Sequence, residues 1–294
     1  MNHFIFSTHF DTVAVIGEAP LYRGDNPFSS WPQLCQIGQR QSPIDFKTTD
    51  TTLQNFGKID FHNYEIYGNV TVINNGNSVQ INGFPYWANP PYMVNGGFNG
   101  KYNLQQMHFH WSSTDFAGSE HTVDGRHYAM EIHMVHFKEI PSNQFKSILE
   151  EPEGIAVVGI LMTLTDVSRA FWALEPALPN VVTFNSSIEI ASFSPNDFFP
   201  QNTDAFYRYS GSLTTPGCNE NVVWTVFTNP GNISTKQLSM FRRIQDSTNA
   251  AHDFNFRPTQ PLNGRTVFLR DPRGTSPNSN LSIFFFFVAI FTHF

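Results

Sequence analysis

Residues 106–138 read QMHFHWSSTDFAGSEHTVDGRHYAMEIHMVHFK and hold more than half of the chain's eleven histidines. Near the start of this stretch, His108 and His110 stand two positions apart. In an extended strand, residues i and i+2 project from the same face. The spacing therefore predicts a strand that presents two imidazoles side by side.

The end of the same stretch, EIHMVHF, has the alternation of a second strand. This alternation places Glu131, His133 and Val135 on one face and turns His136 to the other. If the two strands pair, three histidines converge and leave a fourth direction open. Catalytic zinc sites have this arrangement, in which three protein ligands leave room for water.

Simpler interpretations exist for these histidines. A single histidine on a strand is more often a core or surface residue than a ligand, and an HxH pair also occurs by chance. The third histidine, preceded by a carboxylate on the same face, favours the metal site. Gln106 and Glu131 are oxygen-bearing neighbours of the kind that hold a ligating imidazole in one tautomer.

The composition restricts the classes of protein that remain. The chain has 294 residues, a formal net charge of -7 and no run of Lys and Arg, which argues against a nucleic-acid-binding surface. No repeat or low-complexity linker divides the middle of the chain. We therefore expect one domain, large enough to bury a substantial core.

Short segments rich in β-branched and aromatic residues predict a β protein. They are NVTVINN (69–75), SVQING (78–83), LQQMHFHW (104–111), YAMEIHMVHF (128–137), IAVVGILMTL (155–164) and VVWTVF (222–227). The fifth segment is almost continuously apolar, which suits a strand in the middle of a sheet. Helical signals are few: KQLSMFRRIQD (236–246) follows the cap candidates Ser234 and Thr235, and SNQFKSILEE (142–151) is weaker.

Both ends of the chain carry apolar segments. Residues 1–18 lack the basic start and the unbroken apolar run of a secretory signal, so they are at best a degraded one. Residues 272–294 contain the apolar run LSIFFFFVAIF (281–291), which is too short for a membrane-spanning helix. This end is either part of a lipid-anchor signal, which would associate the protein with a membrane, or a loose terminus. Sequons that permit N-glycosylation stand at Asn69, Asn185, Asn232 and Asn280.

Several motifs follow one another in the order found in a known family. They are GQRQSPID (38–45), QMHFHW (106–111), GSEHTVDG (118–125), EIHMVHF (131–137), SGSLTTPGC (210–218) and NFRPTQPLNGR (255–265). Over residues 19–271 the chain therefore resembles an α-class carbonic anhydrase. The resemblance implies an α/β, mainly β, single domain around a large, mostly antiparallel twisted sheet, with short peripheral helices and zinc in a conical cleft. The implied activity is the zinc-dependent, reversible hydration of carbon dioxide to bicarbonate and a proton.

The resemblance also implies roles for individual residues. His108, His110 and His133 match the three zinc ligands, while Gln106 and Glu131 match partners of the first and the third. The implied apolar pocket for carbon dioxide consists of Val135, Val157, Leu213, Thr215, Val222 and Trp224.

Two further residues match the groups that direct the nucleophile. Thr214 matches a threonine that hydrogen-bonds the zinc-bound hydroxide, and Glu120 matches the glutamate that accepts this threonine's proton. Together they would turn a hydroxide lone pair towards the carbon of carbon dioxide. A backbone carbonyl near Asn255 matches the partner of the middle zinc ligand.

The implied proton path departs from the family pattern. Asn77 stands where the fastest members carry a proton-shuttling histidine, and an amide cannot take up a proton near neutral pH as imidazole does. Tyr22 and Asn75 match residues that order the water path. Pro20 replaces an early tryptophan, and Gly217 stands where many members have a second proline.

The two cysteines bear on location. From spacing alone, Cys35 and Cys218 could be free thiols of a cytosolic protein or a pair in an exported one. Both match the disulfide of extracellular and membrane-bound carbonic anhydrases, which implies a secreted or membrane-anchored protein. Two other functions stay open: a non-catalytic binding or scaffold protein on the same fold, and a zinc hydrolase of esters. The sequence does not give the oligomeric state.

Overall fold

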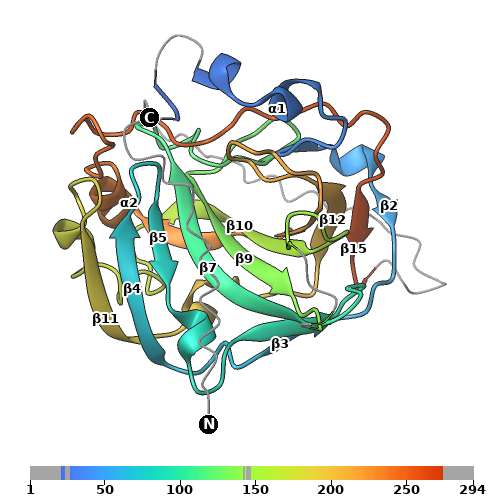
Figure 1. The fold of residues 1–294 in the computed structure, drawn as a ribbon, viewed down its shortest axis with the longest axis horizontal. Helices are drawn as coiled ribbons and strands as arrows, with labels where there is room; N and C mark the ends of the chain where they lie inside the picture. The colour runs from blue at the N-terminus through green and yellow to red at the C-terminus, as the bar shows by residue number, and fades with distance from the viewer. Residues whose placement is uncertain (1–20, 24–26, 142, 144–146, 274–294) are drawn as a thin grey trace, which may run out of the picture.

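The computed structural model describes residues 21–23, 27–141, 143 and 147–273. Strands dominate it, and the helices are short and peripheral (Figure 1). The predicted N-terminal segment 1–18, Pro20, Asn280 and nearly all of the predicted tail 272–294 lie outside the described residues. Within the described part, no helix combines the length and the apolar character needed to cross a membrane.

One large twisted sheet organises the chain (Figure 1). Its strands are β2 (Thr52–Leu53), β3 (Ile59–His62), β4 (Gly68–Asn74), β5 (Val79–Asn82), β6 (Tyr92–Asn95), β7 (Tyr102–Trp111), β9 (Met130–Lys138), β10 (Ile155–Thr165), β11 (Ser187–Phe193), β12 (Phe206–Gly211), β13 (Val222–Phe227), β14 (Gly231–Ser234) and β15 (Phe268–Arg270). Two further strands, β1 (Asp45–Phe46) and β8 (Thr122–Val123), form a separate parallel pair.

The order of the strands confirms the predicted architecture. The main path runs β11–β4–β5–β7–β9–β10–β13–β12–β15–β2, with β14 beside β10 and β3 joined through β6 to β7. Described neighbours are antiparallel except where β10 meets β13 and β14 and where β15 meets β2. Each of the six strand segments predicted from sequence coincides with a strand of this sheet, and the apolar β10 lies buried between β9 and β13.

The helices agree with the sequence only in part. Helix α2 (Thr235–Phe241) begins after Ser234, whose hydroxyl accepts from the Gln237 amide while the Gln237 side chain accepts from the Ser234 amide. This capping box confirms the predicted start, although the helix ends before residue 246. The weaker prediction over 142–151 is wrong for its described residues, because 147–151 form a turn. The remaining helical segments are α1 (Gln33–Ile37) and single 3₁₀ turns at Pro27–Ser30, Thr48–Asp50, Phe84–Tyr86, Leu178–Asn180 and Pro195–Phe198.

Alternate side chains of the central strands enter two different cores. In β13, Trp224 belongs to the same apolar cluster as Val135 and Val157. Val223, its neighbour in β13, and Val158 of β10 pack in the larger cluster on the other face. Because the side-chain period of a strand is two, each central strand contributes to both cores.

A disulfide joins α1 to the loop that follows β12. Cys35 and Cys218 are bonded across a sequence separation of 183 residues, which confirms the pairing expected from the resemblance. Tyr22 and Trp31 pack with the two cysteines in a small apolar cluster. The bond therefore ties the beginning of the described chain to the segment that contains Thr214.

We expect the Cys35→Ser/Cys218→Ser double variant to unfold with a free energy lower by about 2–5 kcal/mol, because the disulfide closes a very long loop. Urea unfolding of both proteins measures the difference. Reductant should lower the urea midpoint of the wild type towards that of the double variant. It should leave the midpoint of the double variant unchanged. Equal midpoints for the two oxidised proteins would contradict the expectation.

Candidate metal centre

Three histidines converge where β7 and β9 run side by side. His108 and His110 project from β7, and His133 lies in β9 opposite His108. Nε2 of His110 and Nε2 of His108 lie 3.1 and 3.3 Å from Nδ1 of His133. The three nitrogens are close enough to hold one metal ion. The structure thus brings together the three residues predicted as ligands.

The second nitrogen of each imidazole is bound to an oxygen atom. These bonds run from His108 Nδ1 to Gln106 Oε1 (2.9 Å), from His110 Nδ1 to the Asn255 carbonyl (2.7 Å) and from His133 Nε2 to Glu131 Oε1 (2.8 Å). Because a neutral imidazole carries one proton, the bonds leave lone pairs on the three converging nitrogens. The donor set fits zinc, which binds neutral imidazole readily.

Burial sets the charge of these groups. It lowers the pKa of both His108 and His110, and the neighbouring imidazoles lower that of His108 further. Burial by itself would raise the pKa of Glu131, but the charges and hydrogen bonds of His121 and His133 outweigh it and hold this pKa well below its usual range. The low pKa values of His108 and His110 favour metal binding, because an imidazole must be deprotonated to act as a ligand.

Glu131 also binds residues that the sequence did not connect with it. Its Oε1 accepts from His121 Nδ1 at 2.7 Å, and its Oε2 accepts from the amides of Glu120 and His121 at 2.9 and 2.7 Å. His121, Glu131 and His133 are therefore also close enough to hold an ion, but direct hydrogen bonds already occupy their facing atoms. The place of His121 beside Glu120 in GSEH indicates that it lies near the site, but not that it bonds Glu131.

Glu120 carries an unpartnered acceptor at the centre of the site. Its Oε1 accepts from the Arg257 amide at 2.8 Å. Its Oε2 is buried, has no hydrogen-bond partner among the described residues, and lies 3.6 Å from His110 Nε2. Thr214 is buried but does not donate to Glu120 in the described contacts, so that bond stays a prediction.

An apolar wall stands on the same face of the sheet. The predicted pocket residues Val135, Val157, Val222 and Trp224 are buried in one cluster, and Leu213 packs against it. The Trp224 ring lies against that of His133, with 4.8 Å between the centroids. The structure therefore brings the predicted wall to the converging histidines.

The predicted proton path is linked to the ligand shell by backbone contacts. The Asn75 side chain accepts from the Asn77 amide at 3.0 Å and donates to Gln80 at 3.1 Å. The Asn77 carbonyl accepts from the side chain of Asn255, the residue whose own carbonyl holds His110. Tyr22 is buried nearby, and burial raises its pKa well above the usual value, so its hydroxyl stays protonated at neutral pH.

The fold and the site define a mainly β protein whose large mixed sheet carries three oriented imidazoles, close enough together to hold a metal ion, beside an apolar wall. The family model of the eukaryotic-type carbonic anhydrases matches residues 26–271, so the chain belongs to this family. The resemblance inferred from the six motifs is thereby confirmed.

Relatives of known name agree with this assignment. The chain is 36% identical over 252 residues to "Putative carbonic anhydrase 5" of Caenorhabditis elegans. The matched region is 85% of this chain and 81% of that protein. It is 32% identical over 254 residues to carbonic anhydrase 1 of Monodelphis domestica, with 84% and 95% covered. It is 34% identical over 256 residues to carbonic anhydrase 3 of Mus musculus, with 84% and 96% covered.

We expect the His110→Ala variant to bind zinc more than about 100-fold more weakly than the wild type. Removing only a hydrogen-bond partner of a ligand already lowers metal affinity about 10–100-fold, and this variant removes a ligand itself. Competition with a chromophoric chelator measures the affinity. His62→Ala is the matched control, since His62 is exposed in β3 and stacks on Tyr92. Equal affinity of wild type and His110→Ala would show that the metal binds elsewhere.

Proposed function

We propose that this chain catalyses the reversible hydration of carbon dioxide to bicarbonate and a proton, with zinc held by His108, His110 and His133. The observation that carries the proposal is the convergence of three oriented imidazoles beside an apolar wall on one sheet face. The names of the related proteins support it.

The residues fit zinc, and they also fit the chemistry that zinc supplies. A bound zinc ion is a Lewis acid that makes water a competent nucleophile near neutral pH, the role it has in carbonic anhydrases generally. Carbon dioxide is linear and nonpolar, so no strong hydrogen bond can hold it. Val135, Val157, Val222 and Trp224 would hold it by contact and exclude bulk water, with Leu213 and Thr215 completing the pocket.

Thr214 and Glu120 would orient the nucleophile. Glu120 Oε2 is a buried acceptor without a partner, and buried acceptors are costly when unpaired. A hydroxyl at Thr214 that donates its proton to Glu120 can only accept from the attacking oxygen. That oxygen would then present a lone pair to the carbon atom.

The disulfide is consistent with an extracellular location, where such bonds persist. We propose that the protein is secreted or membrane-anchored. The sequons at Asn69, Asn185 and Asn232 are exposed and accessible to glycosylation in that compartment. The domain would extend over residues 19–271, as the sequence analysis predicts.

Two other functions use the same fold. A non-catalytic binding protein would not need Glu120 and Thr214 beside the three histidines, so the complete set favours catalysis. An esterase would use the same nucleophile on an activated carbonyl, and the close apolar wall favours carbon dioxide over a bulkier ester. Hydration and ester assays on one preparation would rank these activities.

We expect zinc-loaded protein to hydrate carbon dioxide and to lose this activity when a chelator removes the metal. The Thr214→Ala variant should lose about 100-fold in kcat/KM, as when one oriented donor or acceptor is removed from an active site. Stopped-flow measurement with a pH indicator gives the rates. Thr49→Ala, on an exposed turn, is the matched control. Activity that persists after complete zinc removal would refute the proposed function.

Proton export should limit this enzyme, because Asn77 cannot take up a proton. We expect Asn77→His to raise the turnover about tenfold at low buffer concentration, with the difference vanishing as external buffer takes over. Turnover against buffer concentration measures the effect. Asn180→His, on the exposed 3₁₀ turn Leu178–Asn180, controls for an added imidazole. No gain at low buffer would show that another step is rate-limiting.

A further inference from the structure

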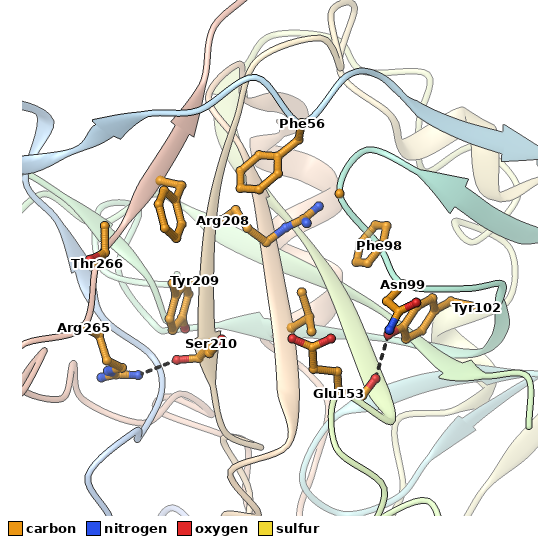
Figure 2. Close-up of a pocket in the computed structure, with 13 residues that line it drawn as sticks. Phe56, Phe98, Asn99, Tyr102, Glu153, Arg208, Tyr209, Ser210, Arg265 and Thr266 are labelled. Atoms are coloured by element: carbon orange, nitrogen blue, oxygen red, sulfur yellow. Dashed lines mark hydrogen bonds between the residues drawn. The ribbon is translucent and has the colours of Figure 1, made fainter.

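A cavity lies mainly on the side of the sheet opposite the histidines, although Tyr209 also contributes to its lining. It has a volume of about 370 Å³, and its lining includes Phe56, Phe98, Tyr102, Arg208, Val223 and Phe268 (Figure 2). In β12, Tyr207 and Tyr209 pack in the core that contains Trp224, so Arg208 between them faces the other way. The cavity is therefore separate from the proposed zinc site.

Arg208 is a buried cation that forms no ion pair among the described residues. The residue is buried, with only 5% of its surface exposed. Nε donates to Thr225 Oγ1 at 3.0 Å, and Nη2 has no hydrogen-bond partner among the described residues. Burial lowers the pKa of Arg208 to about 10, so the guanidinium remains charged at neutral pH. Glu153 also lines the cavity and its charge raises the pKa of Arg208, but its side chain is exposed and forms no described ion pair with Arg208.

Aromatic rings surround this guanidinium. Its central carbon lies 4.2 Å from the ring centre of Phe98 and 5.1 Å from those of Phe56 and Phe206. Figure 2 shows the guanidinium pointing towards the space between Phe56 and Phe98. Cation–π contacts stabilise the charge only in part, because a ring offers no acceptor for the N–H groups. A buried guanidinium with an unused donor is best completed by an anion.

We propose that this cavity binds a small organic monocarboxylate, with its carboxylate on Arg208 and its apolar body against Phe56, Phe98, Val223 and Phe268. The volume is in the range of small-molecule sites, which are mostly apolar with a few placed polar groups. Arg265 also lines the cavity, but its guanidinium donates to backbone carbonyls such as those of Ser210 and Gln41, so the unused donor belongs to Arg208.

Benzoate is the probe for this site, and neutral benzamide of the same shape is its control. We expect benzoate to bind at least about tenfold more tightly than benzamide, since a charge-assisted hydrogen bond is stronger than a neutral one. Isothermal titration and chemical-shift mapping measure affinity and place. The affinity should be equal in zinc-loaded and zinc-free protein, because the cavity lies away from the histidines. Binding that requires zinc would place benzoate at the metal and overturn the proposal.

The Arg208→Met variant should lose at least about tenfold in benzoate affinity, whereas Arg126→Met, which changes an exposed arginine, should not. Should Arg208→Met fail to fold, Phe98→Ala tests the apolar wall and should weaken benzoate without removing its preference over benzamide. Equal affinities in wild type and both cavity variants, or shifts that map outside the cavity, would overturn the proposal. The result does not depend on hydration activity, so the two proposals can fail separately.

Discussion

The buried carboxylate of Glu131 holds the centre of this molecule together. It accepts from the rings of His133 and His121 and from the backbone amides of Glu120 and His121. An ionised carboxylate can be buried only when its oxygens are fully hydrogen-bonded. Four donors from two separate segments meet this demand. As a result, the orientation of one candidate ligand and the position of Glu120 are fixed by the same group.

The C-terminal segment supplies a second set of constraints to the same site. The Asn255 carbonyl holds His110, while its side chain accepts from the Trp111 amide and donates to the carbonyls of Phe109 and Asn77. One residue therefore connects β7 to the predicted proton path. Arg257 then holds Glu120 through its amide and donates its side chain to the Cys35 carbonyl. The strands that carry the candidate ligands are thus positioned by a segment that is distant in sequence.

Local pattern was enough to predict the strands that hold the site, because the side-chain period of a strand is visible in a few residues. It placed His108, His110 and His133 on facing strands. It could not reveal the bond between His121 and Glu131, because the path of the loop between them is set by tertiary packing. Strand β15 is only three residues long and pairs in parallel with β2, which has only two, so no local signal marks it.

The failed helix has a similar explanation. Ile148 is buried in the apolar cluster on the metal side, and the chain turns tightly around it at residues 147–151. An apolar residue that anchors a turn gives the same local pattern as one face of a short helix.

The metal-site motifs were more reliable because six of them occur in a fixed order over most of the chain. The Thr214–Glu120 contact depended on that resemblance, and the described contacts do not contain it.

The disulfide has a consequence for how the molecule is made. Cys35 is synthesised early, but its partner Cys218 appears only after ten of the thirteen strands of the main sheet have been made. The covalent bond cannot close before that point, whatever the order in which the sheet assembles. The segment that carries Thr214 is therefore locked to α1 late in biosynthesis, over strands that are already complete. During translation, β7 and β9, which carry the candidate ligands, are therefore made before the disulfide can form.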